Sequence, residues 1–353
     1  MVFITCLCLE ESERNSKNMK ILTIVIPSYN SEQFIEKNMK TFIDERLSEK
    51  VEILLINDGS KDNTAQKALE YQKKYPGYIR LINKENGGHG SVINRGIIEA
   101  AGRYFKVVDA DDWVETNNLV RLVQILEKSQ EDLILNPYIK IDQQTRKTQG
   151  CGSEQKIDKN ETIDFQDIKK NFLFITLHSI TYKTEILREH KIKLTENCFY
   201  EDFEYDFYPI PYIRTCKILD FPVYWYLVGQ KTQSVNAISG LKNIEMYIRV
   251  LNDSIDYYNY IVEYADVVTK SYMEKFLCNY IRSMYNIFLR NGKVNNILQK
   301  MLKADKELKN KSIYFYKLVE EQNMYIRLLR TQNNFVFKII SIAFRLYKRK
   351  EVN

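Results

Sequence analysis

From about residue 20 to residue 135 the sequence alternates short apolar runs with stretches in which apolar residues recur at helical spacing. Continuous apolar runs rich in β-branched residues are typical of strands that are buried on both faces of a sheet. Strands that alternate with helices favour parallel strand–helix–strand units. The pattern predicts strands at 21–26, 51–56, 78–82, 104–108 and 132–135, and helices at about 31–47, 64–75, 91–101 and 117–129.

The expected fold class is therefore α/β, with a Rossmann-like, mostly parallel sheet that carries helices on both faces. The pattern weakens after about residue 140, where residues 142–170 are polar and loop-like. Residues 217–229 predict a strand or a hairpin pair, and Pro222 indicates a sheet edge or a turn. From about residue 239 the periodicity is helical, so we expect a helical C-terminal region.

Composition narrows the class of protein. Of the 353 residues 44% are hydrophobic, which is enough for a large core and excludes a disordered chain. The 52 Lys+Arg exceed the 46 Asp+Glu by six, an excess too small to indicate a nucleic-acid partner. The six cysteines form no CxxC pair, and no run of 18 apolar residues predicts a membrane-spanning helix. We expect a cytoplasmic, reduced protein.

Residues 1–18 do not resemble the rest of the chain. A short apolar run is followed by a polar stretch, without the basic residues or the cleavage site of a signal peptide. Met19 is followed at once by KILTIVIPSYN, and so reads like a natural start. Residues 1–18 are therefore predicted to be an unstructured leader or tail.

Polar clusters follow the first four predicted strands. Ligands of open parallel sheets bind beyond the carboxyl ends of the strands, so these clusters should meet in one crevice. They are PSYN at 27–30, NDGS at 57–60, NGGHG at 86–90 and DADD at 109–112.

The cluster DADD places three carboxylates, Asp109, Asp111 and Asp112, within four positions. Carboxylates this close repel one another unless a positive charge lies among them, and Mg²⁺ or Mn²⁺ prefers such oxygen ligands. An acidic turn that caps the next helix is the alternative.

The other clusters each allow a structural and a functional interpretation. Asp58 could accept a hydrogen bond from a nucleobase or only form a turn, and Tyr29 could stack on a base or only follow a strand. The glycines of 86–90 could let the backbone approach a ligand or simply form a loop. No GxGxxG follows the first strand and no GxxxxGK[ST] occurs, which argues against a dinucleotide-dependent oxidoreductase and a P-loop enzyme.

Taken in order, five segments resemble the family 2 glycosyltransferases of the GT-A fold, especially the bacterial members that build cell-surface polysaccharides. The resemblance covers about residues 20–235. It implies an inverting transferase that moves a hexosyl or N-acetylhexosaminyl group from a nucleotide sugar, usually UDP-linked, to a glycan or lipid-linked acceptor. It also implies a divalent cation, Mn²⁺ or Mg²⁺. The segments are IVIPSYN, INDGS, ENGGHGSVINRGI, AAGRYFKVVDADDW and YEDFEYDF.

The resemblance assigns roles to the clustered residues. Pro27 and Tyr29 would line the base pocket, Asp58 would accept the base N3–H, and Asn86 would lie near the base or ribose. Asp109 and Asp111 match the family's DxD motif.

Of that pair Asp111 is the better candidate for direct metal contact, with Asp109 facing the ribose or a metal-bound water. Asp112 could replace either of them. Many relatives carry Arg-Asn after the glycine loop, whereas this chain has Ile93-Asn94 followed by Arg95, so the family's arginine contact is in doubt.

In the second half, the family's Glu-Asp pair is matched by Glu201-Asp202, and Asp202 would be the general base. We favour Asp202 over Glu204 and Asp206 on that match, although the segment could also be a solvated acidic helix face. Residues 230–236 resemble the segment that closes over the diphosphate, where Lys231 or Gln233 could contact the donor, or they form a polar loop.

The sequence predicts one glycosyltransferase domain at 19–235, with a nucleotide-sugar-binding half at 19–135 and an acceptor half at 136–235. Residues 236–353 form the helical region. Its end, residues 335–353, contains five basic residues and one acidic residue. An apolar, basic helix at 335–350 suits an anionic membrane surface, and so places the protein on the inner face of the cell membrane. Docking on the body or on a second subunit, in a homo-oligomer, is the alternative. A catalytically degenerate nucleotide-sugar or glycan-binding protein is the rival function.

Overall fold

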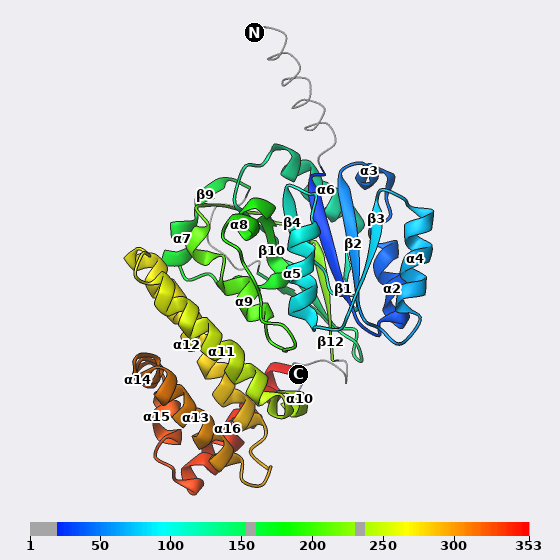
Figure 1. Ribbon diagram of the computed structural model, residues 1–353. Coiled ribbons are helices and arrows are strands. Elements are labelled where there is room, and N and C mark those ends of the chain that lie inside the picture. The colour runs from blue at the N-terminus through cyan, green and yellow to red at the C-terminus, as the bar shows by residue number, and fades with distance from the viewer. Residues whose placement is uncertain (1–19, 153–159, 230–236, 353) are drawn as a thin grey trace. The chain divides into compact units, whose positions relative to one another are not determined.

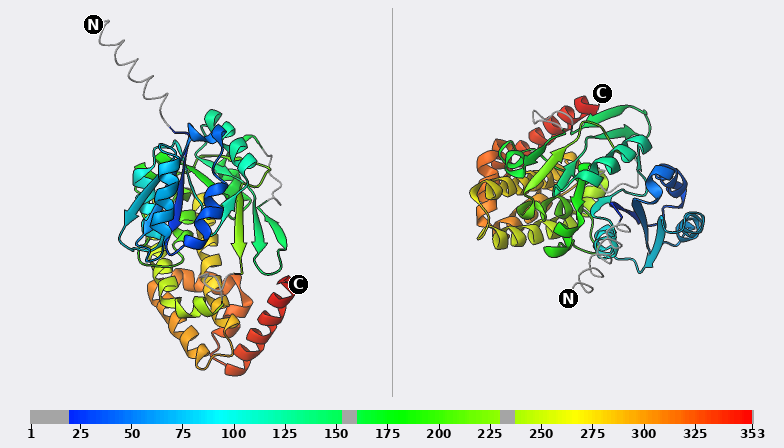
Figure 2. Two further views of the ribbon diagram at one scale, coloured as in Figure 1. Left: turned by 90° about the vertical axis from the view of Figure 1, so that its right-hand side faces the viewer. Right: turned by 90° about the horizontal axis from the view of Figure 1, so that it is seen from above.

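The computed structural model describes residues 20–152, 160–229 and 237–352 (Figures 1 and 2). The chain divides into two compact units. Of the described residues, the first unit contains those from 20 to 168 together with 175–197 and 212–228, and the second contains 169–174, 198–211, 229 and 237–352. The predicted leader at 1–18 lies outside the described residues, and the predicted domain boundaries stay predictions.

The first unit is built on an eight-stranded sheet with the order β3-β2-β1-β4-β10-β6-β11-β9. Neighbours β3, β2, β1 and β4 are parallel, as are β6 and β11, whereas β10 and β9 run antiparallel to their neighbours. Every residue of β1 and β2 is buried, which explains their continuous apolar sequences. The strands are β1 Leu22–Ser28, β2 Val51–Asp58, β3 Ile79–Lys84, β4 Tyr104–Val107, β6 Leu133–Leu135, β9 Thr162–Asp164, β10 Ile180–Lys183 and β11 Thr215–Ile218.

Helices pack on both faces of this sheet, with α5 in front of the strands and α6 behind them in Figure 1. The predicted helix at 31–47 is wrong as a single element, because it is two helices. Asp44 adopts an extended conformation, with φ of −151°, and its side chain accepts a hydrogen bond from Arg46 N, which starts the second helix. The helices are α2 Glu32–Lys40, α3 Glu45–Ser48, α4 Thr64–Lys74, α5 His89–Glu99, α6 Thr116–Lys128, α8 Thr184–Glu189 and the 3₁₀ turn η1 Leu177–Ser179, and α7 Phe165–Lys170 begins in this unit.

A smaller sheet has the order β5-β12-β7-β8, formed by Trp113–Val114, Tyr224–Val228, Tyr138–Asp142 and Thr148–Cys151. Residues 142–170 are therefore not a continuous loop, although the half-exposed β7 and the mostly exposed β8 explain their polar sequence. The two strands of 217–229 belong to different sheets, so the predicted hairpin is wrong. Pro222 lies in the connection between them, outside both strands.

The second unit is helical, as predicted for the C-terminal region. Its longest helix, α12, contacts α10, α11, α13, α14 and α16 and buries an apolar face among them. Asp266 caps the start of α12 through hydrogen bonds from Val268 N and Thr269 N. The helices are α9 Asp202–Phe207, α10 Ala237–Lys242, α11 Ile244–Ile261, α12 Val267–Arg290, α13 Ile297–Lys311, α14 Ile313–Gln322, α15 Met324–Leu329 and α16 Asn334–Val352.

No helix in the described part of the chain is long and apolar enough to cross a bilayer. The last helix, α16, drawn in red in Figure 2, lies along one side of the helical unit. Ser341 faces the unit, because its hydroxyl donates to Leu289 O at 2.8 Å and packs against Gly292. A side chain at Gly292 would overlap Ser341, so glycine permits this close approach.

Candidate active site

The four polar clusters contact one another at the carboxyl ends of β1, β2 and β4. Asn30 N donates to Ser60 Oγ at 2.9 Å, which joins the first cluster to the second. Gly87 N donates to Asp58 Oδ1 at 2.9 Å, which joins the second to the third. The ring of His89 lies 2.8 Å from Asp109 Oδ1, which joins the third to the fourth. The predicted convergence is therefore present in the first unit.

Asp58 is buried and holds the glycine loop. Its Oδ1 accepts hydrogen bonds from Lys84 Nζ at 2.7 Å and from Gly87 N, and its Oδ2 accepts one from Gly88 N at 2.8 Å. Gly88 has a φ of +81°, which glycine adopts without strain, and it directs its N–H toward the carboxylate while α5 begins. The predicted hydrogen bond to a base N3–H is not tested, but the carboxylate already has three donors.

The predicted base pocket contains one exposed ring. Pro27 is buried in β1, whereas the side chain of Tyr29 is 51% exposed, which leaves its ring open for stacking. Asn86 is also exposed, and its amide donates to Asp58 O at 2.9 Å, so the residue is held against the end of β2. Their roles in nucleotide binding stay predictions.

The DADD turn is fixed from two sides. The amide of Asn38 on α2 donates to Asp109 O at 3.2 Å and to Asp112 O at 2.8 Å. From β12, the hydroxyl of Tyr224 donates to Asp112 Oδ2 at 2.6 Å and accepts from Asp109 N at 3.2 Å. Leu227 N donates to Asp112 Oδ1 at 2.7 Å. Asp112 therefore anchors the turn to β12, while Asp111 is only half-buried.

Three side chains form a potential metal site. One oxygen of Asp109, one of Asp112 and one ring nitrogen of His178 lie within 4.8 Å of one another. Among the residues that the structure describes, Asp111 does not join this group, although its predicted metal contact is not tested.

Electrostatics in this group fit a cation. Burial raises the pKa of Asp112 well above its ordinary value, and the charges of Asp111 and Asp109 raise it further. Burial also opposes ionisation of Asp109, but the charge and hydrogen bond of His89 outweigh it and lower the pKa of Asp109. A divalent cation would relieve the repulsion between the carboxylates, so these donors suit a hard or intermediate metal ion.

His178 is the residue that the sequence analysis missed. It lies in η1, 66 positions or more from the carboxylates, and only the fold brings it to them. Burial lowers the pKa of His178 to about 4, so the imidazole is neutral at pH 7 and offers a lone pair. Its Nδ1 is buried and has no hydrogen-bond partner in the described part of the chain.

The acidic segment forms α9 in the second unit. Glu201, Glu204 and Asp206 are buried, and Glu204 accepts a hydrogen bond from Tyr208 Oη at 3.0 Å. Asp202 is the exposed one of these four acids, and its Oδ1 accepts from Phe203 N at 3.0 Å. The exposed position leaves Asp202 accessible to a hydroxyl, but its role as the base stays a prediction.

The remaining predicted contacts lie elsewhere. Ile93 is buried in the core, and Arg95 pairs with Glu99 at 2.6 Å on the exposed side of α5. Asn94 instead holds the segment before α9 in place, through hydrogen bonds with the backbone of Leu194. Gln233 and Lys231 lie outside the described residues.

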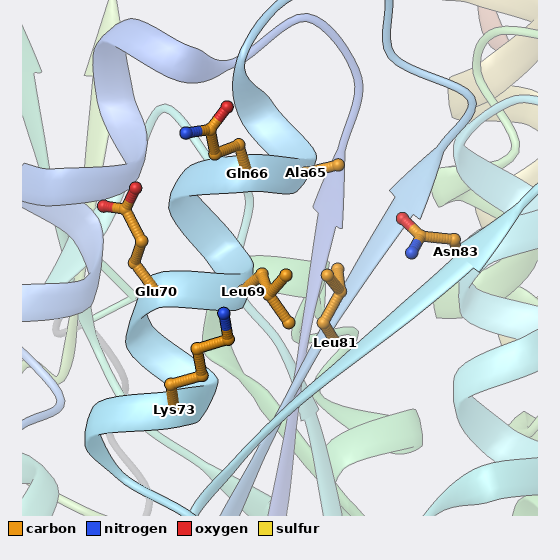
Figure 3. A pocket seen from close by; sticks show the side chains of 7 residues that line it. All are labelled: Ala65, Gln66, Leu69, Glu70, Lys73, Leu81 and Asn83. Atoms are coloured by element: carbon orange, nitrogen blue, oxygen red, sulfur yellow. The ribbon is translucent and has the colours of Figure 1, made fainter.

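A hollow of about 480 Å³ opens between α4 and β3, where Leu69 and Leu81 face each other (Figure 3). None of the predicted site residues lines it. It is lined by Ala65, Gln66, Leu69, Glu70, Lys73, Leu81 and Asn83.

Comparison with known proteins decides the family. Residues 23–191 match Glycosyl transferase family 2. This segment, which is just under half of the 353 residues, therefore belongs to that family. The matched residues span β1 through η1 and β10, and so contain the DADD turn, the glycine loop and His178.

Relatives and structural neighbours agree with this assignment. The chain is 38% identical to the Bacillus subtilis (strain 168) uncharacterized glycosyltransferase EpsJ over 114 residues, 32% of this chain and 33% of that protein. It is 27% identical to the minor teichoic acid biosynthesis protein GgaB of the same organism over 181 residues, 50% of this chain and 19% of GgaB. The chain thus spans only part of each of these curated relatives.

A structure of S. aureus TarS 1-349 in complex with UDP-GlcNAc superposes with a TM-score of 0.62 at 15% identity, covering 92% of each chain. At this identity the likeness concerns the fold alone. It confirms the predicted GT-A α/β class with a helical C-terminal region.

Proposed function

We propose that the protein is an inverting glycosyltransferase of cell-surface polysaccharide synthesis. It moves a hexosyl or N-acetylhexosaminyl group from a UDP-sugar to a hydroxyl of a glycan or lipid-linked acceptor. The observation that carries the proposal is the meeting of the DADD turn, the Asp58-held glycine loop and the exposed Tyr29 in a chain of glycosyltransferase family 2. The likeness to TarS, solved in complex with UDP-GlcNAc, and to GgaB, a minor teichoic acid biosynthesis protein, supports this donor and acceptor class.

The transfer needs one base. Asp202 takes the proton from the acceptor hydroxyl as that oxygen forms a bond to the anomeric carbon. The bond from this carbon to the diphosphate oxygen breaks at the same time, and the nucleoside diphosphate leaves with the electron pair. Attack from the face opposite the leaving group inverts the anomeric configuration. A positioned base of this kind contributes about 10²–10⁴-fold to the rate.

The nucleotide-binding side is supplied by the first unit. The ring of Tyr29 stacks on the uracil, Pro27 closes the base pocket, and Asn86 lies near the base or ribose. Asp109 and either Asp111 or Asp112 would hold Mn²⁺ or Mg²⁺, which would supply positive charge to stabilise the departing diphosphate. Gln233 is proposed to contact that diphosphate.

A panel of nucleotide sugars in a thermal-shift assay tests the donor class. UDP-sugars should raise the melting temperature only when Mn²⁺ or Mg²⁺ is present, and GDP- or dTDP-sugars should raise it less. Stabilisation without any turnover would favour the rival, a degenerate binding protein. No stabilisation by any UDP-sugar would contradict the proposal.

We further propose that the protein works in the cytoplasm, at the inner face of the cell membrane, through α16. One side of this helix packs on its own unit through Phe337 and Ser341. The other side is apolar and exposed, and the sequence of residues 335–353 carries five basic residues and one acid, a combination that favours an anionic lipid surface as the partner. The exposed side is formed by Phe335, Ile339, Ile342 and Leu346, which are 51–71% exposed.

Vesicle sedimentation tests this contact. The full chain should pellet with vesicles that contain phosphatidylglycerol and not with pure phosphatidylcholine, and the double variant Ile339→Glu/Ile342→Glu should stay in the supernatant. Tyr260→Glu is a matched control, because Tyr260 is 66% exposed on another helix, α11. Equal pelleting of the double variant would rule out α16 as the membrane contact, and concentration-dependent self-association would favour a homo-oligomer instead.

A further inference from the structure

We propose that His178 is a nitrogen ligand of the divalent cation, and that the site therefore prefers Mn²⁺ to Mg²⁺. The proposal rests on the proposed function to the extent that a cation binds at the DADD turn. It changes the expected ligand set, because the sequence predicted carboxylates alone.

The first observation is the position of the ring. A nitrogen of His178 shares a space no wider than 4.8 Å with oxygens of Asp109 and Asp112. Metal–ligand bonds of about 2.0–2.2 Å bring ligand atoms within about 4.4 Å of one another, so one ion would contact all three residues after at most a small movement of a side chain. The group also differs from an ordinary solvent-exposed cluster of acids, because Asp112 is only 1% exposed.

The second observation is an unsatisfied atom. The Nδ1 of His178 is buried and lacks a hydrogen-bond partner among the residues that the structure describes. Buried polar atoms are normally hydrogen-bonded, and a neutral imidazole needs both a donor and an acceptor contact. A metal ion on one ring nitrogen would satisfy part of this requirement.

The third observation is that the ring is held in one orientation. It stacks on Tyr138 with ring centroids 5.0 Å apart, lies 4.2 Å from Tyr226, and meets the edge of Tyr224 at 4.9 Å. The backbone around it is held by the buried Lys106 on β4, which donates to His178 O at 3.2 Å and to Ile180 O at 2.9 Å. Ligands whose rotamers are fixed by packing bind metal without a large ordering cost.

A nitrogen ligand changes which metal ion the site prefers. Mg²⁺ demands a near-octahedral shell of oxygen ligands and usually keeps several waters. Imidazole is instead a good ligand for first-row transition metals. A shell of two carboxylates and one imidazole therefore shifts the preference from Mg²⁺ toward Mn²⁺ and the later transition metals.

His89 is the competing nitrogen. Its ring is within 2.8 Å of Asp109 Oδ1, but it is not part of the three-residue group. The third histidine of the chain, His190, stacks on Tyr212 and is also outside that group. Because the chain has only three histidines, each can be tested separately.

The test is pulsed electron paramagnetic resonance of Mn²⁺ bound to the untagged full chain with UDP. The wild type should show modulation from a directly bound ¹⁴N, and labelling all histidines with ¹⁵N should remove it. His178→Gln should abolish the modulation, whereas His89→Gln, the matched control, should keep it. In titrations His178→Gln should bind Mn²⁺ at least about tenfold more weakly, with a much smaller change for Mg²⁺.

Several results would overturn the proposal. Mn²⁺ that binds without nitrogen modulation would refute the ligand role of His178 while leaving the proposed transferase function intact. Modulation that is lost in His89→Gln would show that His89, and not His178, supplies the nitrogen ligand. Absence of Mn²⁺ binding would overturn both this proposal and the metal dependence of the proposed function. If His178→Gln does not fold, modulation that persists in both His89→Gln and His190→Gln still assigns the nitrogen to His178, because the chain has only three histidines.

Discussion

Replacing Asp58 with Asn should destabilise the first unit. The carboxylate is 4% exposed and accepts from Lys84 Nζ and from the N–H groups of Gly87 and Gly88, at 2.7–2.9 Å. These bonds use both oxygens, whereas Asn has one oxygen and would turn its NH₂ toward a donor. Removing one partner of a buried ion pair costs about 3–5 kcal/mol. We expect the lower part of this range, because Lys84 keeps acceptors in Glu85 O and Ser91 Oγ.

Urea unfolding followed by tryptophan fluorescence measures this loss. Both tryptophans of the chain, Trp113 and Trp225, belong to the first unit, so the signal reports on the unit that contains Asp58. Asp142→Asn is a matched control. Its three hydrogen bonds all go to Oδ1, an oxygen that Asn also has, so the midpoint should barely move.

The result that would refute the reasoning is a stable Asp58→Asn protein. A loss below about 1 kcal/mol, an ordinary value for one hydrogen bond, would show that the carboxylate does not hold the glycine loop. If such a protein had also lost its affinity for UDP, Asp58 would act as the acceptor for the base, as the family resemblance implies.

Two further changes should affect the same unfolding curve. Tyr224→Phe removes the hydroxyl that joins Asp112 to Asp109 N and should cost about 1–3 kcal/mol, and an unchanged midpoint would contradict this. Burial opposes ionisation of Glu131, but hydrogen bonds from Thr162 and Lys217 outweigh it and lower its pKa to about 2. The ordinary pKa is about 4.3, so this carboxylate stabilises the fold by about 3 kcal/mol above that pH, and the contribution is lost as the pH falls toward 2. Glu131→Gln should remove that part of the acid dependence, and identical curves for both proteins from pH 5 to 2 would disprove it.

The strands of the large sheet could be predicted because burial on both faces leaves an unmistakable apolar run. β1, β2 and β4 occur within two residues of their predicted ends. The smaller sheet could not be predicted, since β5 has two residues and β8 is mostly exposed, so neither imposes a hydrophobic pattern. The break between α2 and α3 depends on the capping side chain of Asp44, which periodicity alone does not reveal.

The meeting of the polar clusters was also predictable, because it follows from parallel strands. The partners within the clusters were not. Lys84 lies opposite Asp58 in the register of β3 and β2, so opposite charges at the ends of neighbouring strands were a usable signal. No such signal links Tyr224 or His178 to Asp112, because their proximity depends on the pairing of β12 with β5 and on the placement of η1.

Release of UDP from UDP-sugars, with water as the acceptor and Mn²⁺ present, tests the central claim most directly. The wild type should release UDP, and a chelator should stop it. Asp202→Asn should release UDP about 10²–10⁴-fold more slowly while binding UDP as tightly as the wild type. No release from any UDP-sugar, or an Asp202→Asn protein as active as the wild type, would contradict a glycosyltransferase that uses Asp202 as its base.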